Sequence, residues 1–169
     1  MSGYATYSDF CGLFIADSRP LYLLAFVLTG KHANAEQCFL ETLEDAADAD
    51  SVFVGWERSW SKRRLIMNAI RLVFSCSVER NWKPDAWGVA DSEAGGYSAV
   101  NAVTRLAPPL QRFVFVMSVL ECYSERECAI LLGCTPRDVV AARIGAMKQL
   151  PSLDPTVTQV AERNGTYDH

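Results

Sequence analysis

Apolar residues in the first third of the chain recur at the three-to-four-residue spacing of helices. Two such groups flank Pro20: Phe10, Leu13 and Phe14, then Leu21, Leu24, Ala25 and Leu28. Pro20 suits the first turn of a helix, where its missing N–H costs little, and Gly30 can end that helix in a left-handed conformation. A third helix is predicted to begin at Asn34, with Gln37 as its reciprocal capping partner. Its predicted buried residues are Ala35, Cys38, Phe39, Thr42, Leu43 and Ala46.

The next helical pattern runs from Ser51, its predicted N-cap, to about Phe74. Placed on a helix, it has an inward face of Leu65, Ile66, Ala69, Leu72 and Val73 and an outward face of Trp60, Arg64, Met67 and Arg71. Arg58 and Lys62 would fall on the apolar side of one straight helix. The pattern therefore predicts a break near residues 59–61.

The last part of the chain has the pattern of a helix-turn-helix. Pro108-Pro109 opens a helix, and Ser124 with Glu127 forms a capping box that opens the next one. Gly133 stands where a tight turn needs a left-handed residue, and Thr135 is the predicted N-cap of a final helix with Pro136 at its first position. The final helix is predicted to bury Val139, Val140, Ile144, Met147 and Leu150.

Between these helical parts, residues 75–97 lack periodicity and contain Gly, Pro, Ser and Asn, which is typical of a linker on which Trp82 and Trp87 dock locally. The sequence therefore predicts an all-α fold of two small helical domains joined by a linker, the C-terminal one a helix-turn-helix. Their predicted limits are 1–76 for the first domain, 77–98 for the linker, 99–151 for the second domain and 152–169 for a polar tail.

Charge is distributed unevenly along the chain, although the net charge is only −4. Residues 1–50 contain eight acids and two bases, a balance of −6. Residues 51–74 contain five bases and one acid, a balance of +4, and residues 98–150 contain six bases and four acids, a balance of +2. This division indicates different partners for different segments.

Several classes of function are disfavoured by the residues present. The six cysteines form no C-x-x-C pair and only two histidines accompany them, so we expect buried reduced thiols, no metal and no cofactor. No nucleophile–base pairing, phosphate loop or acid pair at a credible spacing indicates an enzyme. The apolar runs are too short to span a bilayer and no secretory signal is visible, so we expect a cytoplasmic protein that does not contact a membrane.

The segments 105–112 and 124–135 resemble the promoter-reading C-terminal domain of bacterial RNA polymerase sigma factors, most closely the extracytoplasmic-function group. The first part of the chain is similar to that group's core-binding helices at Asp9-Phe10, Leu13-Phe14, Leu21-Tyr22, Leu24-Ala25, Leu28-Thr29-Gly30, Ala35-Glu36 and Glu41-Thr42-Leu43. The resemblance covers about residues 8–74 and 100–150. It implies core RNA polymerase and double-stranded promoter DNA as partners, with an anti-sigma protein as an additional candidate.

The resemblance implies a polymerase-docking face on the third helix, formed by Asn34, Glu36, Gln37, Leu40 and Glu41. The family usually carries acids at the positions of Asn34 and Gln37 and a glutamine at that of Leu40. Leu40 could instead serve as an apolar interface anchor. The alternative is a solvated helix face.

The following segment would melt and read the minus-ten promoter element, which requires aromatic surfaces for unstacked bases and cations for phosphates. Its candidate residues are Trp56, Arg58, Trp60, Lys62, Arg63, Arg64, Asn68 and Arg71. Stacking contributes on the order of 1–3 kcal/mol per base. Tryptophans four residues apart are, alternatively, core residues on one helix face.

The final helix would read the minus-thirty-five element, with candidate residues Arg126, Thr135, Arg137, Arg143 and Lys148. The family often has lysine or arginine at Val140, Ala142 and Gly145, so we expect reduced affinity, with Arg137 and Arg143 making most contacts. The alternative interpretation is a helical hairpin that packs for stability alone and does not contact DNA.

The leading hypothesis is a sigma-like transcription initiation factor. A second is a degenerate sigma-derived interaction protein that keeps the fold and lacks promoter reading. A third is a redox or metal sensor built on Cys122, Cys128 and Cys134, although their six-residue spacing would scatter the thiols.

Overall fold

The computed structural model describes residues 3–49, 51–78 and 98–153. They fall into two compact units, one before and one after the stretch 79–97. Every regular element in the described ranges is a helix, so the predicted all-α architecture of two helical domains is confirmed. The predicted linker and polar tail, with Trp82 and Trp87, lie almost wholly outside the described residues, and their limits stay predictions.

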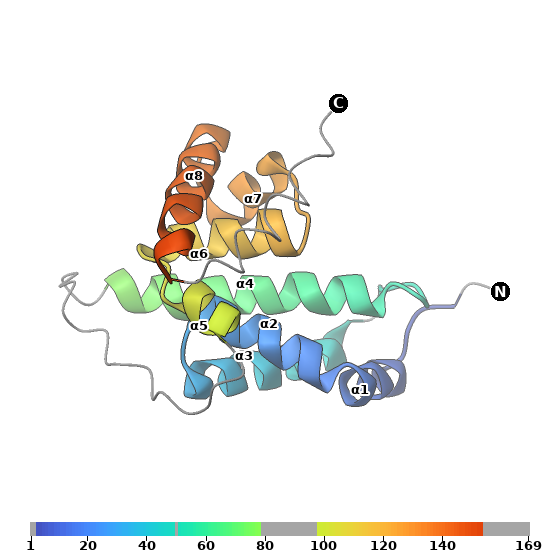
Figure 1. Cartoon of the computed structure of the whole chain (residues 1–169). Coiled ribbons are helices and arrows are strands. Elements are labelled where there is room, and N and C mark those ends of the chain that lie inside the picture. The colour runs from blue at the N-terminus through green and yellow to red at the C-terminus, as the bar shows by residue number, and fades with distance from the viewer. Residues whose placement is uncertain (1–2, 50, 79–97, 154–169) are drawn as a thin grey trace. The chain divides into compact units, whose positions relative to one another are not determined.

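The described residues of the N-terminal unit form four α-helices and one short 3₁₀ turn (Figure 1). Their bounds are α1 Tyr7–Ala16, α2 Ser18–Thr29, α3 His32–Asp45, η1 Ala46–Asp48 and α4 Glu57–Val78. No single helix among the described residues is both long and apolar enough to cross a bilayer, and α1 with α2 meets that test only as a pair bent by 80°.

Helix α2 packs on both α3 and α4, which themselves pack together. The fully buried side chains that join them include Leu21, Leu28, Cys38, Leu65 and Ile66. The thiol of Cys38 donates to the carbonyl of Leu65 over 3.3 Å, which links α3 to α4 within this core. A second cluster, made by Ala5, Phe10, Ala46, Ala49 and Val52, packs the start of the chain against the segment before α4.

Local signals predicted the limits of α2 correctly and those of its neighbours less well. Gly30 is left-handed at φ 73° and ends α2 as predicted. Asn34 is not an N-cap, because α3 begins at His32 and no side chain caps it. Ser51 does not begin α4 either: residues 51–56 form turns, with Gly55 at φ 92°, and the helix starts at Glu57. The predicted break at residues 59–61 is wrong, since α4 runs through it.

The C-terminal unit contains α5 Ser98–Thr104, α6 Pro109–Phe115, the π-helical turn η3 Val116–Leu120 that continues α6, α7 Glu125–Leu132 and α8 Pro136–Leu153. Its core is formed around α6 and η3, where residues 112–117 are all buried. Helix α8 packs on α6 and α7, and more lightly on α5. As predicted, Pro109 occupies the first position of α6, and α7 and α8 form the helix-turn-helix.

Candidate nucleic-acid interface

Both ends of α7 have the local signals that the sequence predicted. At the start of α7, the Glu127 N–H donates to Ser124 Oγ over 3.3 Å, and the Ser124 N–H donates to the Glu127 carboxylate over 2.9 Å. Gly133 then adopts φ 64°, a conformation that suits glycine because it has no Cβ. The capping box fixes where α7 begins, and Gly133 fixes where it ends and so where α8 can begin.

A second capping box begins α8. The Asp138 N–H donates to Thr135 Oγ1 over 3.2 Å, while the Thr135 N–H donates to the Asp138 carboxylate over 2.9 Å. Hydrogen bonds from the side chain and backbone of Thr135 hold the pKa of Asp138 below its usual value. Thr135 is exposed but already engaged as a cap, and Asp138 stays ionised at the positive end of the helix.

The buried face of α8 consists of Val139, Ala142, Ala146 and Leu150. Ile144 is not part of it, contrary to the prediction, because its side chain is 48% exposed. Val140 and Met147 lie half-buried at one edge of that face. Small residues at 142 and 146 let α8 approach α6 closely, which the sequence pattern of large apolar residues did not reveal.

Two positions where basic residues were expected to contact DNA face the protein instead. Ala142 is buried. A Cβ at Gly145 would come within 2.5 Å of the side-chain amide of Gln111, which also accepts a 2.6 Å hydrogen bond from Gln149. The absence of charge at Ala142 and Gly145 therefore reflects packing of α8 on α6, and it leaves the outer face of α8 unaffected.

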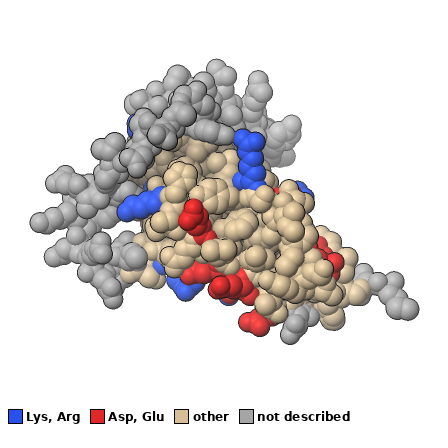
Figure 2. Space-filling view, turned by 90° about the horizontal axis from the view of Figure 1, so that it is seen from below, with Lys and Arg blue, Asp and Glu red and all other residues tan. Residues whose placement is uncertain are grey.

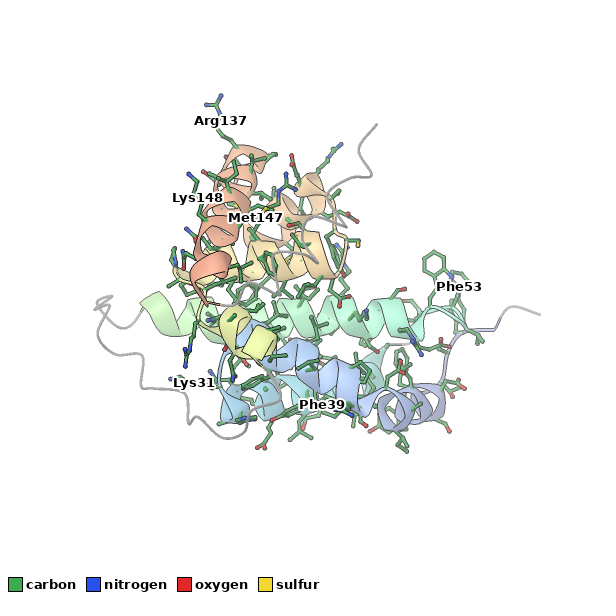
Figure 3. All side chains as sticks on the ribbon, viewed as in Figure 1. Lys31, Phe39, Phe53, Arg137, Met147 and Lys148 are labelled. Carbon is green, nitrogen blue, oxygen red and sulfur yellow. The ribbon has the colours of Figure 1, made fainter. Side chains whose placement is uncertain are left out.

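The outer face of α8 consists of Arg137, Ala141, Ile144 and Lys148, all exposed. On a helix these four positions fall on one narrow stripe, opposite the buried face. Figure 3 shows Arg137 and Lys148 extending away from the α8 ribbon, Arg137 near its first turn. We call these four residues the outer stripe of α8.

Arg143 does not share that orientation. It is half-buried and its guanidinium lies 2.6 Å from the Glu125 carboxylate, so it ties α8 to α7. In this conformation Glu125 already engages the guanidinium of Arg143, and a DNA contact of Arg143 stays a prediction. Arg126, the predicted DNA-contacting cation on α7, is exposed at the start of that helix.

The N-terminal unit exposes aromatic side chains just before α4. Trp56 is 68% exposed, more than any other aromatic residue among those described. Phe53 stacks on Tyr4 with ring centroids 5.1 Å apart, and an antiparallel bridge joins the same two residues. Figure 3 shows Phe53 at the end of the unit where α4 begins. The sequence pattern does not indicate Tyr4 and Phe53, because it places Phe53 in a helix and predicts no partner for residues 3–5.

Trp60 has a structural position instead. It is half-buried and packs edge-on against Phe10, with ring centroids 5.1 Å apart, in the cluster that joins α1 to the pre-α4 segment. The alternative of a core tryptophan is the correct one for Trp60, and its predicted outward orientation is wrong. Trp56 and Trp60 therefore differ: the Trp56 side chain is exposed, whereas the Trp60 side chain packs against Phe10.

Most basic residues of α4 are paired with acids of the same unit. Arg58, Arg64 and Arg71 each lie 2.7 Å from a carboxylate: that of Asp17, Asp45 and Glu41, respectively. Figure 2 shows acidic and basic side chains side by side within a largely uncharged face. Arg63 is exposed and forms no ion pair with any described residue, and Lys62 is half-buried.

Asn68 is buried, only 4% exposed, so its predicted place on a phosphate-facing side is wrong. Its amide donates to Asp45 over 2.8 Å and to Thr42 over 3.2 Å. Hydrogen bonds from Arg64 and then Asn68 lower the pKa of Asp45 against an opposing effect of burial. Asn68 thus positions the Arg64–Asp45 pair between α3 and α4.

The predicted docking face of α3 is partly available. Glu36, Gln37 and Leu40 are exposed, Leu40 at 57%, whereas Asn34 is half-buried. Glu41 is half-buried and held by Arg71. Gln37 donates to Glu41 over 3.0 Å, so these residues form one connected polar surface around an exposed leucine.

The cysteines follow the expectation of buried thiols only in part. Cys38 and Cys128 are buried, and burial raises their pKa values to about 12 and about 11. Cys122, in contrast, is exposed, at φ 58° between η3 and α7. Among the described residues, no group of three or more His, Cys, Asp and Glu side chains could hold a metal ion.

The described architecture is similar to a solved structure of the sigma factor RpoE in complex with the anti-sigma factor NepR from Bartonella quintana. The TM-score is 0.58 at 21% sequence identity, and the match covers 86% of this chain and 96% of that chain. No family model and no curated protein matches the chain. At this identity the likeness shows a sigma-factor-like fold.

Proposed function

We propose that the chain is a sigma-like transcription initiation factor that binds core RNA polymerase and directs it to specific promoters. One observation carries the proposal: a single chain of sigma-factor-like fold presents an exposed aromatic surface at the start of a basic helix and a cation-bearing outer face on a helix-turn-helix. The two features correspond to the two contacts that such a factor makes with a promoter.

On the polymerase side, the docking surface is the exposed part of α3. Leu40 supplies an apolar centre, and Glu36 and Gln37 supply polar contacts around it. This arrangement of an apolar anchor with a polar rim is common at protein interfaces. Glu41 contributes through its position beside Gln37, since Arg71 already neutralises its charge.

On the DNA side, Trp56 receives an unstacked base of the minus-ten element and Arg63 contacts the neighbouring phosphate backbone. Arg58, Lys62, Arg64 and Arg71 add positive potential to α4, and the acidic partners of the three arginines reduce it. The outer stripe of α8 reads the minus-thirty-five element, with Arg126 and Thr135 near the point where the helix meets the duplex. Because few of these cationic side chains lack an acidic partner, we expect DNA binding to depend only modestly on salt concentration.

The test is a pull-down of core RNA polymerase with the full chain, followed by run-off transcription from a library of promoter fragments. We expect the chain to bind core polymerase and to produce transcripts that are absent with core polymerase alone. Leu40→Ala should weaken the pull-down, and Leu23→Ala, an exposed leucine on α2, is its matched control. Polymerase binding without promoter-dependent transcripts would contradict the proposal.

That last outcome would favour the second candidate, a sigma-derived interaction protein without promoter reading. The ion pairing of three α4 arginines is the observation that favours it, because paired cations have less to offer to phosphates. An anti-sigma partner is compatible with either candidate, and the similar RpoE was solved with such a partner bound. Co-purification of a protein that blocks transcription would support it.

A further inference from the structure

The outer stripe of α8 has a composition that restricts what it can recognise. Its two central residues, Ala141 and Ile144, are exposed and carry no side-chain hydrogen-bond donor or acceptor, while its two end residues, Arg137 and Lys148, are cations. Ile144 leaves 48% of its surface in water, whereas Val139, Val140, Met147 and Leu150 on the same helix are at least half-buried. The stripe is therefore an apolar centre between two positive ends.

The charges along this stripe favour duplex DNA over a protein as its occupant. No acidic residue lies on the stripe itself, and the nearest acid, Asp138, is held within the capping box by Thr135. The four positions extend over roughly 16 Å at 1.5 Å per residue. That length matches about five steps of 3.4 Å along a DNA strand, so the two cations can reach phosphates at either side of a short base sequence.

Of the groups displayed in the major groove, only the C5-methyl of thymine is apolar. Alanine and isoleucine cannot form the paired hydrogen bonds that arginine forms with guanine or asparagine forms with adenine. Ala141 lets the helix lie close to the base edges, and Ile144, one turn further on, reaches the next base pair. An apolar contact with methyl groups is the one base-specific interaction that this face can make at its centre.

We propose that the outer stripe of α8 reads thymine methyl groups in the major groove, through Ile144 and Ala141, while Arg137 and Lys148 hold the flanking phosphates. The proposal rests on the proposed promoter-reading function and names what that helix recognises. It assigns the sequence selectivity of α8 to its two uncharged residues and the bulk of its affinity to the two cations.

The test uses the full chain and a random pool of 20-base-pair duplexes, from which bound sequences are selected. The selected duplexes should share one or two adjacent thymines. Replacing these thymines with deoxyuridine removes only the methyl groups, and each removal should weaken binding about fourfold, the factor that burying one CH₂ group contributes. In Ile144→Ala the thymine and deoxyuridine duplexes should bind with more nearly equal affinity.

Ile130→Ala is the matched control, because Ile130 is an exposed isoleucine, 66% accessible, on α7 rather than on the stripe. It should keep the full difference between thymine and deoxyuridine. Equal affinity of the unaltered chain for the two duplexes, or an undiminished difference in Ile144→Ala, would overturn the inference. If those results come with promoter-dependent transcripts, the proposed function stands and only the methyl reading fails. If no sequence is enriched and no transcript forms, both proposals fail.

Discussion

At the scale of single residues, burial separates the thiols into protected and accessible groups. Cys38 and Cys128 are buried, with pKa values raised to about 12 and about 11, so at pH 8 their reactive thiolate forms are scarce. Cys122 is exposed. We expect iodoacetamide to modify Cys122 at least about tenfold faster than either buried thiol, since a buried thiol reacts only after local opening.

Peptide mass spectrometry over a time course measures these rates, and Cys122→Ser provides the control by removing only the fast site. Equal modification rates at Cys122 and Cys128 would contradict the assigned burial. The same comparison tests the sensor hypothesis: a reversible disulfide between Cys122 and Cys128 would revive it, and none is expected because the thiol of Cys128 is enclosed by the protein.

Asp45 is expected to give the N-terminal unit an acid-sensitive component of stability. Its folded-state pKa is lowered by hydrogen bonds from Arg64 and Asn68, so its contribution is present above the unfolded-state pKa of about 3.9 and is lost as the pH falls through the folded-state value. Asp45→Asn should cost about 1 kcal/mol at pH 7, because the pair is partly exposed.

Urea titrations at pH 7, 5, 4 and 3 measure this contribution. The difference in unfolding free energy between the unaltered chain and Asp45→Asn should be constant down to about pH 5 and should shrink below about pH 4. Asp48→Asn, an exposed acid in η1, is the control and should show a smaller difference throughout. A difference for Asp45→Asn that grows on acidification would exclude the assigned ion pair.

The residue-scale predictions that succeeded have their deciding partner close in the chain, although the equally local pair Asn34–Gln37 failed as a cap. The caps Ser124–Glu127 and Thr135–Asp138 use partners three residues away, so a local pattern contains the whole interaction. Trp60 and Asn68 depend on partners fifty and twenty-three residues away in sequence, Phe10 and Asp45. The hydrophobic periodicity of a sequence does not reveal such long-range contacts. An exposed tryptophan available for base stacking and a tryptophan packed in the core therefore cannot be distinguished from sequence.

At the scale of elements, Arg137 and Arg143 on α8 should respond differently to the same substitution. Arg137 is exposed on the outer stripe, whereas Arg143 ties α8 to Glu125 of α7. Arg137→Ala should weaken duplex binding and reduce the salt dependence by about one phosphate contact, with little change in Tm. Arg143→Ala should lower the stability of the unit by on the order of 0.5–1 kcal/mol, because the ion pair is only partly buried.

Duplex affinity measured at several salt concentrations, together with thermal unfolding, separates the two effects. Glu125→Ala serves as the matched variant, since it breaks the same ion pair from the other side and should resemble Arg143→Ala in Tm. If Arg143→Ala instead reduces the salt slope as much as Arg137→Ala does, then Arg143 leaves Glu125 for DNA and the described orientation is not the bound one.

Element boundaries were predictable where glycine or proline imposes a conformation. Gly30 and Gly133 both adopt the left-handed conformation expected of them, and Pro109 begins α6. The start of α4 was misplaced because Ser51 is a good N-cap by residue type, yet the chain first pairs with residues 3–5 and turns at Gly55. A long-range backbone contact overrode a local capping preference.

At the scale of the whole molecule, the order of apolar patterns was sufficient to predict two helical units, because each unit buries its own core. The proposed promoter contacts lie on different units, Trp56 on one and Arg137 on the other. Since Trp56 and Arg137 belong to units with separate cores, the effects of the two substitutions on function should combine independently.

Trp56→Ala should therefore reduce promoter opening, read as permanganate reactivity of unpaired thymines, by about tenfold or more, the factor that one stacked base contributes. Arg137→Ala should leave opening per bound complex unchanged and reduce occupancy alone. The double variant should show a loss of run-off yield equal to the product of the two single losses.

Trp56→Phe keeps an aromatic face and should restore much of the promoter opening. Full recovery of opening in Trp56→Leu would show that apolar bulk matters rather than stacking. A loss of occupancy equal to the loss of opening in Trp56→Ala would contradict the division of tasks, because it would mean that Trp56 acts before the strands separate.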